Sequence, residues 1–178
     1  MYQNVLTFWF EELTPQQWWQ ADAEFDNTIK QRFSSILKHA TAGELAPWRQ
    51  AAKGRRAEII VLDQFSRNIY RGTAQAFSQD AMALALAQEA VAAGALQQLN
   101  ADERNFLLMP YMHSESVVIH QSAEALFKQH AAQNNYQFEL KHKAIIDRFG
   151  RYPHRNNILG RPSTAEETAF LKQPGSAF

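Results

Sequence analysis

The sequence contains no cysteine, no block of charges of one sign and no Gly/Ser-rich linker. Without cysteine there can be no disulfide, no thiolate nucleophile and no cysteine-ligated metal, which suits a reducing compartment. We therefore expect a cytoplasmic protein. Lys plus Arg and Asp plus Glu each number 18, so the formal net charge is zero. Broad neutralisation of phosphates needs a basic surface, so we expect no nucleic-acid partner.

Long apolar runs are also missing. The most apolar window, residues 81–96, is interrupted by Gln88 and Glu89 and is shorter than the roughly 20 residues that a membrane-spanning helix needs. The first residues, MYQNVLTFWFEEL, have no basic region ahead of the apolar stretch, unlike a signal peptide. We expect a soluble protein that does not contact a membrane.

The positive signals are those of helices. Phe25, Ile29, Phe33 and Leu37 repeat every four residues and form one apolar stripe. Ser, Thr or Asn followed three residues later by Glu or Gln marks several helix starts, and glycines mark several ends. We expect helices near residues 2–12, 15–20, 22–41, 44–52, 55–69, 78–93, 101–109, 114–132, 136–149 and 164–172.

These helices are joined by short connections, which favours antiparallel neighbours. The Ala-rich helix pairs resemble tetratricopeptide-like hairpins, although no repeat of about 34 residues carries that family's full signature. We predict an all-α fold of about eight to ten helices, in antiparallel hairpins stacked in a tetratricopeptide-like array. We expect one helical domain over residues 1–178, with a tail from about residue 173 only loosely docked.

Two segments share the pattern Asp-x-Phe-x-Arg-x-x-x-Arg. The first, LDQFSRNIYRGTAQAF, begins at Leu62, and the second, IDRFGRYPHRNNILGR, begins at Ile146. Ile59, Ile60, Val61, Leu62 and Phe65 leave the first segment little polar surface, so its charged residues must be paired if they are buried. We expect the two segments to face each other, with Asp63 or Asp147 paired to an Arg of the other segment.

Three interpretations of this pattern remain open. The ion pairs can be purely structural, the similarity can be a coincidence, or surplus arginine can bind an anion, since a planar guanidinium group suits carboxylate or phosphate. Four arginines face two aspartates in the two segments, which leaves a formal charge of +2 before other neighbours are counted. The candidate ligand-binding residues are Asp63, Arg67, Asn68, Arg71, Asp147, Arg151, Arg155 and Asn156.

The stretch PYMHSE, between the two segments, offers candidate acid–base residues. Pro110 should end or kink a helix, and Ser114 can cap the next one. His113 and Glu115 would then lie at a helix entrance, and a His beside a carboxylate can act as general acid or base. His154 in the second segment is the third candidate. A capping-region histidine without chemistry is the alternative.

Metal and cofactor signals are absent. The candidates His113, Glu115, His142, Asp147 and His154 show no His-x-x-x-His or Glu-x-x-His spacing, so we expect no metal site. No glycine-rich phosphate loop or dinucleotide fingerprint is present, so we expect no cofactor.

Four separated motifs carry a family resemblance: YQNVLTFWFEEL, LDQFSRNIYRGTAQAF, PYMHSE and IIDRFGRYPHRNNILGRPST. They resemble the bacterial family known as domain of unknown function 924, from Tyr2 to about Leu171. The resemblance implies an all-helical, tetratricopeptide-like fold and no particular activity. Ser66 stands where the family pattern leads us to expect Pro, and Ser lets the helix continue. The motif positions that it supports are Asp63, Gln64, Phe65, Arg67, Asn68, Arg71, His113, Glu115, Arg151, His154, Arg155 and Asn156.

Two classes of function follow. In the first, the protein binds a small anionic molecule in a pocket formed by both segments and, if it is an enzyme, His113 or His154 moves a proton on it. In the second, it is a tetratricopeptide-like module that binds a protein or peptide, and the Asp/Arg network is purely structural. The polar residues gather where helices end, which favours the first class.

Overall fold

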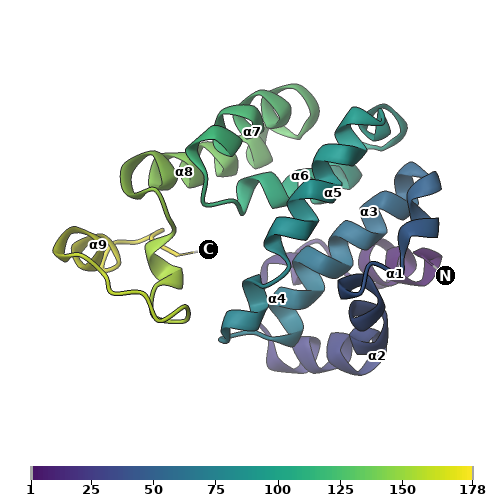
Figure 1. Cartoon of the computed structure of the whole chain (residues 1–178), viewed down its shortest axis with the longest axis horizontal. Helices are drawn as coiled ribbons and strands as arrows, with labels where there is room; N and C mark the ends of the chain where they lie inside the picture. Colours follow the sequence, from purple (N-terminus) through teal and green to yellow (C-terminus); the bar gives the residue numbers. More distant parts are fainter. Residues whose placement is uncertain (1, 178) are drawn as a thin grey trace.

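The computed structural model describes residues 2–177, and these residues contain helices and no β-strand. Figure 1 shows the chain passing from α1 and α2, through α3 and α5, to α7, α8 and α9. No helix within residues 2–177 is both long enough and apolar enough to cross a membrane. The α-helices are α1 (Tyr2–Thr7), α2 (Ala23–Thr41), α3 (Ala52–Ile60), α4 (Ser66–Ile69), α5 (Asp80–Ala92), α6 (Ala101–Met112), α7 (Val117–His130), α8 (Gln133–Phe149) and α9 (Ala165–Phe170).

The predicted all-α class is confirmed, and most expected helices are present with small shifts at their ends. The predicted helices 15–20 and 44–52 are wrong in type, because only 3₁₀ turns form there, over Gln17–Trp19 and Ala46–Gln50. The predicted end at residue 109 is also wrong. Helix α6 continues through Pro110 to Met112, since its last residues are buried against neighbouring helices and packing outweighs the lost hydrogen bond. Ser116, not Ser114, caps α7.

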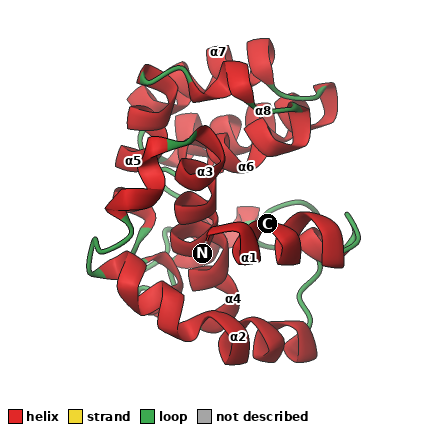
Figure 2. Cartoon of the chain, turned by 90° about the vertical axis from the view of Figure 1, so that its right-hand side faces the viewer, coloured by secondary structure: helices red, strands yellow, loops and turns green. Residues whose placement is uncertain are grey.

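The central helix of the fold is α3 with its continuation. It packs against α1, α5 and α6, and Figure 2 shows it in the middle of the structure. A π-helical turn, Val61–Phe65, joins α3 to α4 without a break. Ile59, Ile60 and Leu62 are completely buried, which confirms that this stretch is enclosed on most sides. The continuous helix therefore carries the first Asp-x-Phe-x-Arg segment through the apolar interior.

The C-terminal half packs in chain order. Helix α6 packs against α7 and α7 against α8, and Gly150 ends α8 in the left-handed conformation (φ 68°). Beyond it, a 3₁₀ turn over Pro153–Arg155 leads toward α9. The tetratricopeptide-like arrangement of these helices remains a prediction.

Candidate functional site

Asp63 lies in the π-helical turn and is completely buried. Its Oδ1 atom accepts hydrogen bonds from Arg67 Nη1 (3.0 Å) and His113 Nδ1 (2.7 Å), and Gln64 donates to Oδ2 (2.5 Å). Burial alone would raise the pKa of Asp63, but the positive charge of Arg67 and the contact with His113 outweigh it and hold that pKa well below its usual range. Asp63 is therefore an ionised carboxylate that can only accept hydrogen bonds.

His113 is consequently fixed in one tautomer. Burial and the charge of Arg67 lower the pKa of His113 below its usual value, although Asp63 opposes them. The ring is thus neutral at pH 7 and uses its one proton on Nδ1 to donate to Asp63. No residue in the described part of the chain hydrogen-bonds Nε2. The lone pair of Nε2 remains free to accept a proton, as in an Asp–His pair of an acid–base site.

Two arginines from distant parts of the sequence converge on Asp80, the first residue of α5. Arg67 donates to both carboxylate oxygens of Asp80 (2.8 and 3.0 Å), and Arg155 Nη1 adds a third bond (3.1 Å). Arg67 also binds Asp63, so one guanidinium group connects the two carboxylates. We refer to Asp63, Arg67, Asp80, His113 and Arg155 as the Asp80 cluster. The first segment, PYMHSE and the second segment all contribute to it.

Charge is concentrated in this cluster. The guanidinium carbons of Arg67 and Arg155 lie 5.6 and 4.5 Å from the centre of the Phe77 ring, a cation–π arrangement. Burial and the nearby charge of Arg67 lower the pKa of Arg155 below its usual value. Its Nε atom is buried and has no hydrogen-bond partner among residues 2–177. The cluster thus contains a buried cation, Arg155, whose Nε–H group donates no hydrogen bond within the described chain.

Side chains of the second segment and of α7 bind the C-terminal end of α6, where His113 lies. Three successive carbonyl groups accept side-chain hydrogen bonds: Met112 from Tyr152 Oη (2.5 Å), His113 from Arg155 Nη2 (3.0 Å) and Ser114 from His120 Nε2 (2.8 Å). Of these donors the guanidinium group of Arg155 is a cation, and a positive group stabilises the partial negative charge of a helix C-terminus. His113 therefore lies at a helix exit, and its predicted position at a helix entrance is wrong.

The other predicted site residues lie outside the cluster. Arg71 and Asn68 both bind Asp26. His154 lies against the Tyr152 ring, and burial lowers its pKa to about 4, with Arg155 adding to the effect. The remaining partners are Lys143 for Asp147, Glu167 for Arg151, Ser163 and Arg161 for Asn156, and Arg161 and the Tyr152 backbone for Glu115.

The expected pairing between segments is therefore wrong in its detail. Asp63 pairs with Arg67 of its own segment, and Asp147 lies at the surface with Lys143. The two segments do meet, but through Asp80, which belongs to neither pattern. Three neighbours outside the two patterns, Asp26, Asp80 and Glu167, pair with the arginines that the pattern aspartates leave over and so offset the formal charge of +2.

Asp80 and Tyr152 are not among the predicted site residues. Asp80 lies in the first turn of a helix, where acidic residues are common for electrostatic reasons alone, so its position carried no distinct signal. Tyr152 occupies the second segment two positions before His154, yet its role depends on carbonyl groups 40 positions away. Only the tertiary structure brings these groups together.

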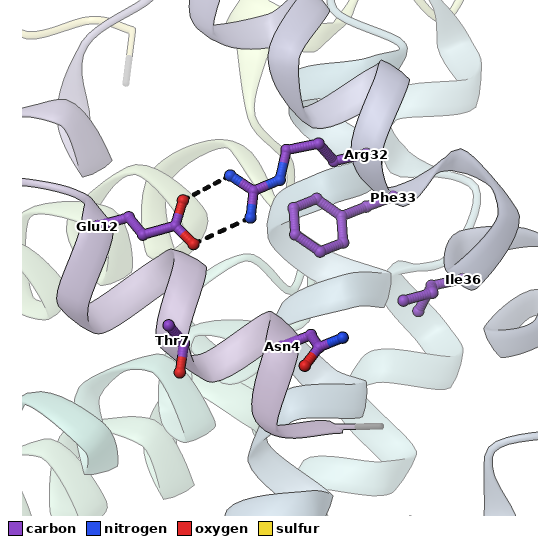
Figure 3. A pocket seen from close by; sticks show the side chains of 6 residues that line it. All are labelled: Asn4, Thr7, Glu12, Arg32, Phe33 and Ile36. Atoms are coloured by element: carbon purple, nitrogen blue, oxygen red, sulfur yellow. Dashed lines mark hydrogen bonds and ion pairs between the residues drawn. The ribbon is translucent and has the colours of Figure 1, made fainter.

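Two surface hollows lie elsewhere. One, of about 400 Å³, lies between the N-terminal helical segment, which contributes Asn4, Thr7 and Glu12, and α2, which contributes Arg32, Phe33 and Ile36. An ion pair between Arg32 and Glu12 spans the two segments (Figure 3). The other, of about 280 Å³, lies between the segment around Phe10–Trp18 and the start of α6. Neither is lined by residues of the Asp80 cluster. Within residues 2–177, no group of three or more His, Asp or Glu side chains is arranged to hold a metal ion.

Comparison with known proteins places the chain in a family. It matches the family described as bacterial protein of unknown function (DUF924) over residues 5–175. The protein of unknown function ATU0120 from Agrobacterium tumefaciens has a similar solved structure, with 35% sequence identity, 96% of each chain covered and a TM-score of 0.91. A comparison with curated proteins gave no match. The chain therefore belongs to the DUF924 family of bacterial proteins.

Proposed function

We propose that the Asp80 cluster binds a small molecule through an anionic group and that His113 exchanges a proton with it. The observation that carries the proposal is the convergence of Arg67 and Arg155 on one partly exposed carboxylate, beside a buried Asp–His pair. Titratable groups whose pKa values are shifted by burial and by a specific charge partner are typical of functional sites. The spare donor Nε of Arg155 adds to this pattern.

The charges of the arginines, His113 and Asp63 assign a role to each group. Two guanidinium groups hold the anion by paired hydrogen bonds. The neutral imidazole of His113 presents the lone pair of Nε2 and can take a proton from a group that the arginines hold nearby. Asp63 then stabilises the resulting imidazolium through the Nδ1–H bond.

Binding is tested by thermal shift and calorimetry with small carboxylates and phosphates. A ligand at 100 times its dissociation constant stabilises the native state by about 2.7 kcal/mol, or roughly 2–4 °C in Tm per kcal/mol. The wild type and Arg151→Ala should both shift, because Arg151 binds Glu167 outside the cluster. A folded Arg155→Ala should not shift. Equal shifts in all three proteins would contradict the assigned site.

The role of His113 has its own test. An anion next to Nε2 raises the pKa of the ring, so binding near pH 6.5 should take up protons. Calorimetry in two buffers with different ionisation enthalpies measures this uptake. His113→Asn keeps a donor for Asp63 and removes the titrating ring, so it should bind the anion without proton uptake. Unchanged uptake in this variant would remove His113 from the mechanism.

A second candidate is a protein-binding module in which the network is structural. Two observations favour it: both segments have each pattern arginine paired within the chain, and Trp19 is 55% exposed while its ring stacks on Phe106. Exposed tryptophans are enriched among interface residues that contribute strongly to affinity. If no anion binds and Arg155→Ala merely melts early, this candidate takes the place of the first.

A further inference from the structure

We infer that the ligand of the Asp80 cluster is a monocarboxylate and that it binds by displacing the Asp80 side chain from Arg67 and Arg155. The inference rests on the proposed function. It adds the chemical class of the anionic group and the event that opens the site.

The hydrogen bonds around Asp80 are those of a bound carboxylate. Its two oxygens accept three bonds from two guanidinium groups, at 2.8, 3.0 and 3.1 Å. All the side-chain hydrogen bonds of Asp80 within the described chain go to these arginines. A free carboxylate has the same two oxygens in the same plane and can accept the same three bonds.

Asp80 is also the member of the cluster best placed to leave. Its side chain is 21% exposed, whereas that of Asp63 is 1% exposed and that of Arg155 is 7% exposed. A released Asp80 carboxylate can be hydrated by water, and it stays in the first turn of α5, where a negative charge is favourable. Asp63 cannot leave its partners in this way, because its carboxylate would then be an unpaired charge in the protein interior.

The charge that remains after displacement selects the ligand. Without Asp80, Asp63 is the one carboxylate left in the cluster, since Glu115, which also lies near Arg155, is paired with Arg161. The neutral His113 adds no charge. The site then carries one uncompensated positive charge. A monocarboxylate neutralises it, whereas a doubly charged phosphate would leave excess negative charge in a partly buried place.

In this scheme the side chain of Asp80 is an internal competitor. A ligand whose binding-competent state is only partly populated binds with an apparent affinity reduced by that fraction. Removing the charge of Asp80 should therefore tighten binding. Asp80→Asn keeps the size of the side chain and one acceptor oxygen, and it removes the charge and the second acceptor.

Calorimetry with acetate, propionate and phosphate tests this inference on three proteins: the wild type, Asp80→Asn and Asp26→Asn. Asp26 forms a bidentate pair with Arg71 outside the cluster, so Asp26→Asn is a matched control. We expect acetate and propionate to bind Asp80→Asn at least about tenfold more tightly than the wild type, with Asp26→Asn unchanged. Should Asp80→Asn fail to fold, Asp80→Ser removes the carboxylate and leaves a small polar side chain at the first position of α5.

The possible failures are distinguishable. Equal carboxylate affinity in the wild type and the Asp80 variant would overturn displacement and leave the proposed function standing. Tighter binding of phosphate than of acetate would overturn the carboxylate assignment alone. If none of the anions binds any of the proteins, the proposed function fails and this inference fails with it.

Discussion

Asp63 and Asp147 open two segments with the same spacing of Asp, Phe and two Args, and the fold treats them in opposite ways. Asp63 lies in a π-helical turn at the centre of a continuous helix and binds an arginine, a histidine and a glutamine. Asp147 lies at the surface in the last turn of α8, and its partner is Lys143. The same contrast holds for the last arginine of each pattern, because Arg71 is 43% exposed and Arg155 only 7%.

Burial in the fold, and not position in the pattern, sets which contacts a residue of either segment makes. In the first segment the buried member is the aspartate at the start, and in the second it is the arginine at the end. Each segment therefore contributes its buried part to the Asp80 cluster, and Asp80 joins them. Two similar sequences therefore contribute different residues to one cluster.

The largest expected effect separates the two aspartates. Asp63→Ala leaves Arg67 and His113 without their buried partner, which should cost about 3–5 kcal/mol of unfolding free energy. Asp147→Ala breaks one surface pair and should change stability by less than about 0.5 kcal/mol. Denaturant unfolding of both variants measures the two values. Similar losses would mean that burial does not distinguish the segments.

Lowering the pH should reduce the unfolding free energy through two buried histidines, His154 in the second segment and His142 beside it. Burial lowers the pKa of His154 to about 4 and that of His142 to about 3. The unfolded chain takes up these protons near pH 6.5, so stability is fully present above that pH and falls as the pH drops toward 4 and 3. At about 1.4 kcal/mol per pKa unit, the loss amounts to several kcal/mol.

His154→Gln should flatten the curve between pH 6.5 and 4, because it removes a ring whose pKa burial lowers to about 4. Unfolding free energies across this range measure the slope. The lowered pKa of Asp63 acts in a separate window, because its stabilisation is lost only as the pH falls below about 4. A wild-type stability that stays constant from pH 7 to 4 would contradict the burial of these rings.

The next largest difference in unfolding free energy should separate the last arginines of the two patterns, Arg155 and Arg71. Arg155→Ala leaves Asp80 with one partner and the His113 carbonyl without its hydrogen bond, so we expect a loss of about 2–4 kcal/mol. Arg71→Ala removes a half-exposed pair with Asp26 and should cost at most about 1 kcal/mol. Chemical denaturation compares the two. A larger loss at Arg71 would reverse our assignment of the buried parts.

The smallest difference between the segments is expected at their glycines, Gly72 and Gly150, where alanine should cost the same unfolding free energy. Gly72 and Gly150 have φ angles of 76° and 68°, and a Cβ atom at either would meet nothing within 4 Å. Alanine therefore costs only the left-handed backbone penalty, about 1 kcal/mol at each position. Thermal unfolding of the two variants measures it. A much larger cost at one glycine would show that its turn is under additional constraint.

Helix content and the burial of the first segment could be predicted because both depend on nearby residues. The stripe Phe25, Ile29, Phe33 and Leu37 predicted α2, and Ile29, Phe33 and Leu37 are buried as expected. The apolar neighbours of Asp63 likewise predicted its enclosure. Both features follow from the spacing of side chains along one helix.

The partners could not be predicted in this way. Asp80 binds Arg155 across 75 positions, and Tyr152 binds the Met112 carbonyl across 40. Pro110 gave a misleading local signal, since tertiary packing keeps α6 intact through it. The packing of whole helices brings the ends of α6 and α8 together. A short sequence pattern carries no information about that packing.

The protonation state of the His113 ring shows most directly whether an anion binds beside it. Long-range ¹H–¹⁵N NMR of ¹⁵N-histidine-labelled protein measures this state during titration with acetate. We predict a neutral ring with its proton on Nδ1 at pH 7, and a selective shift of the Nε2 signal as acetate binds. His113→Asn identifies the signal. A proton on Nε2, or an Nε2 signal that ignores every carboxylate and phosphate tested, would contradict an anion site beside this histidine.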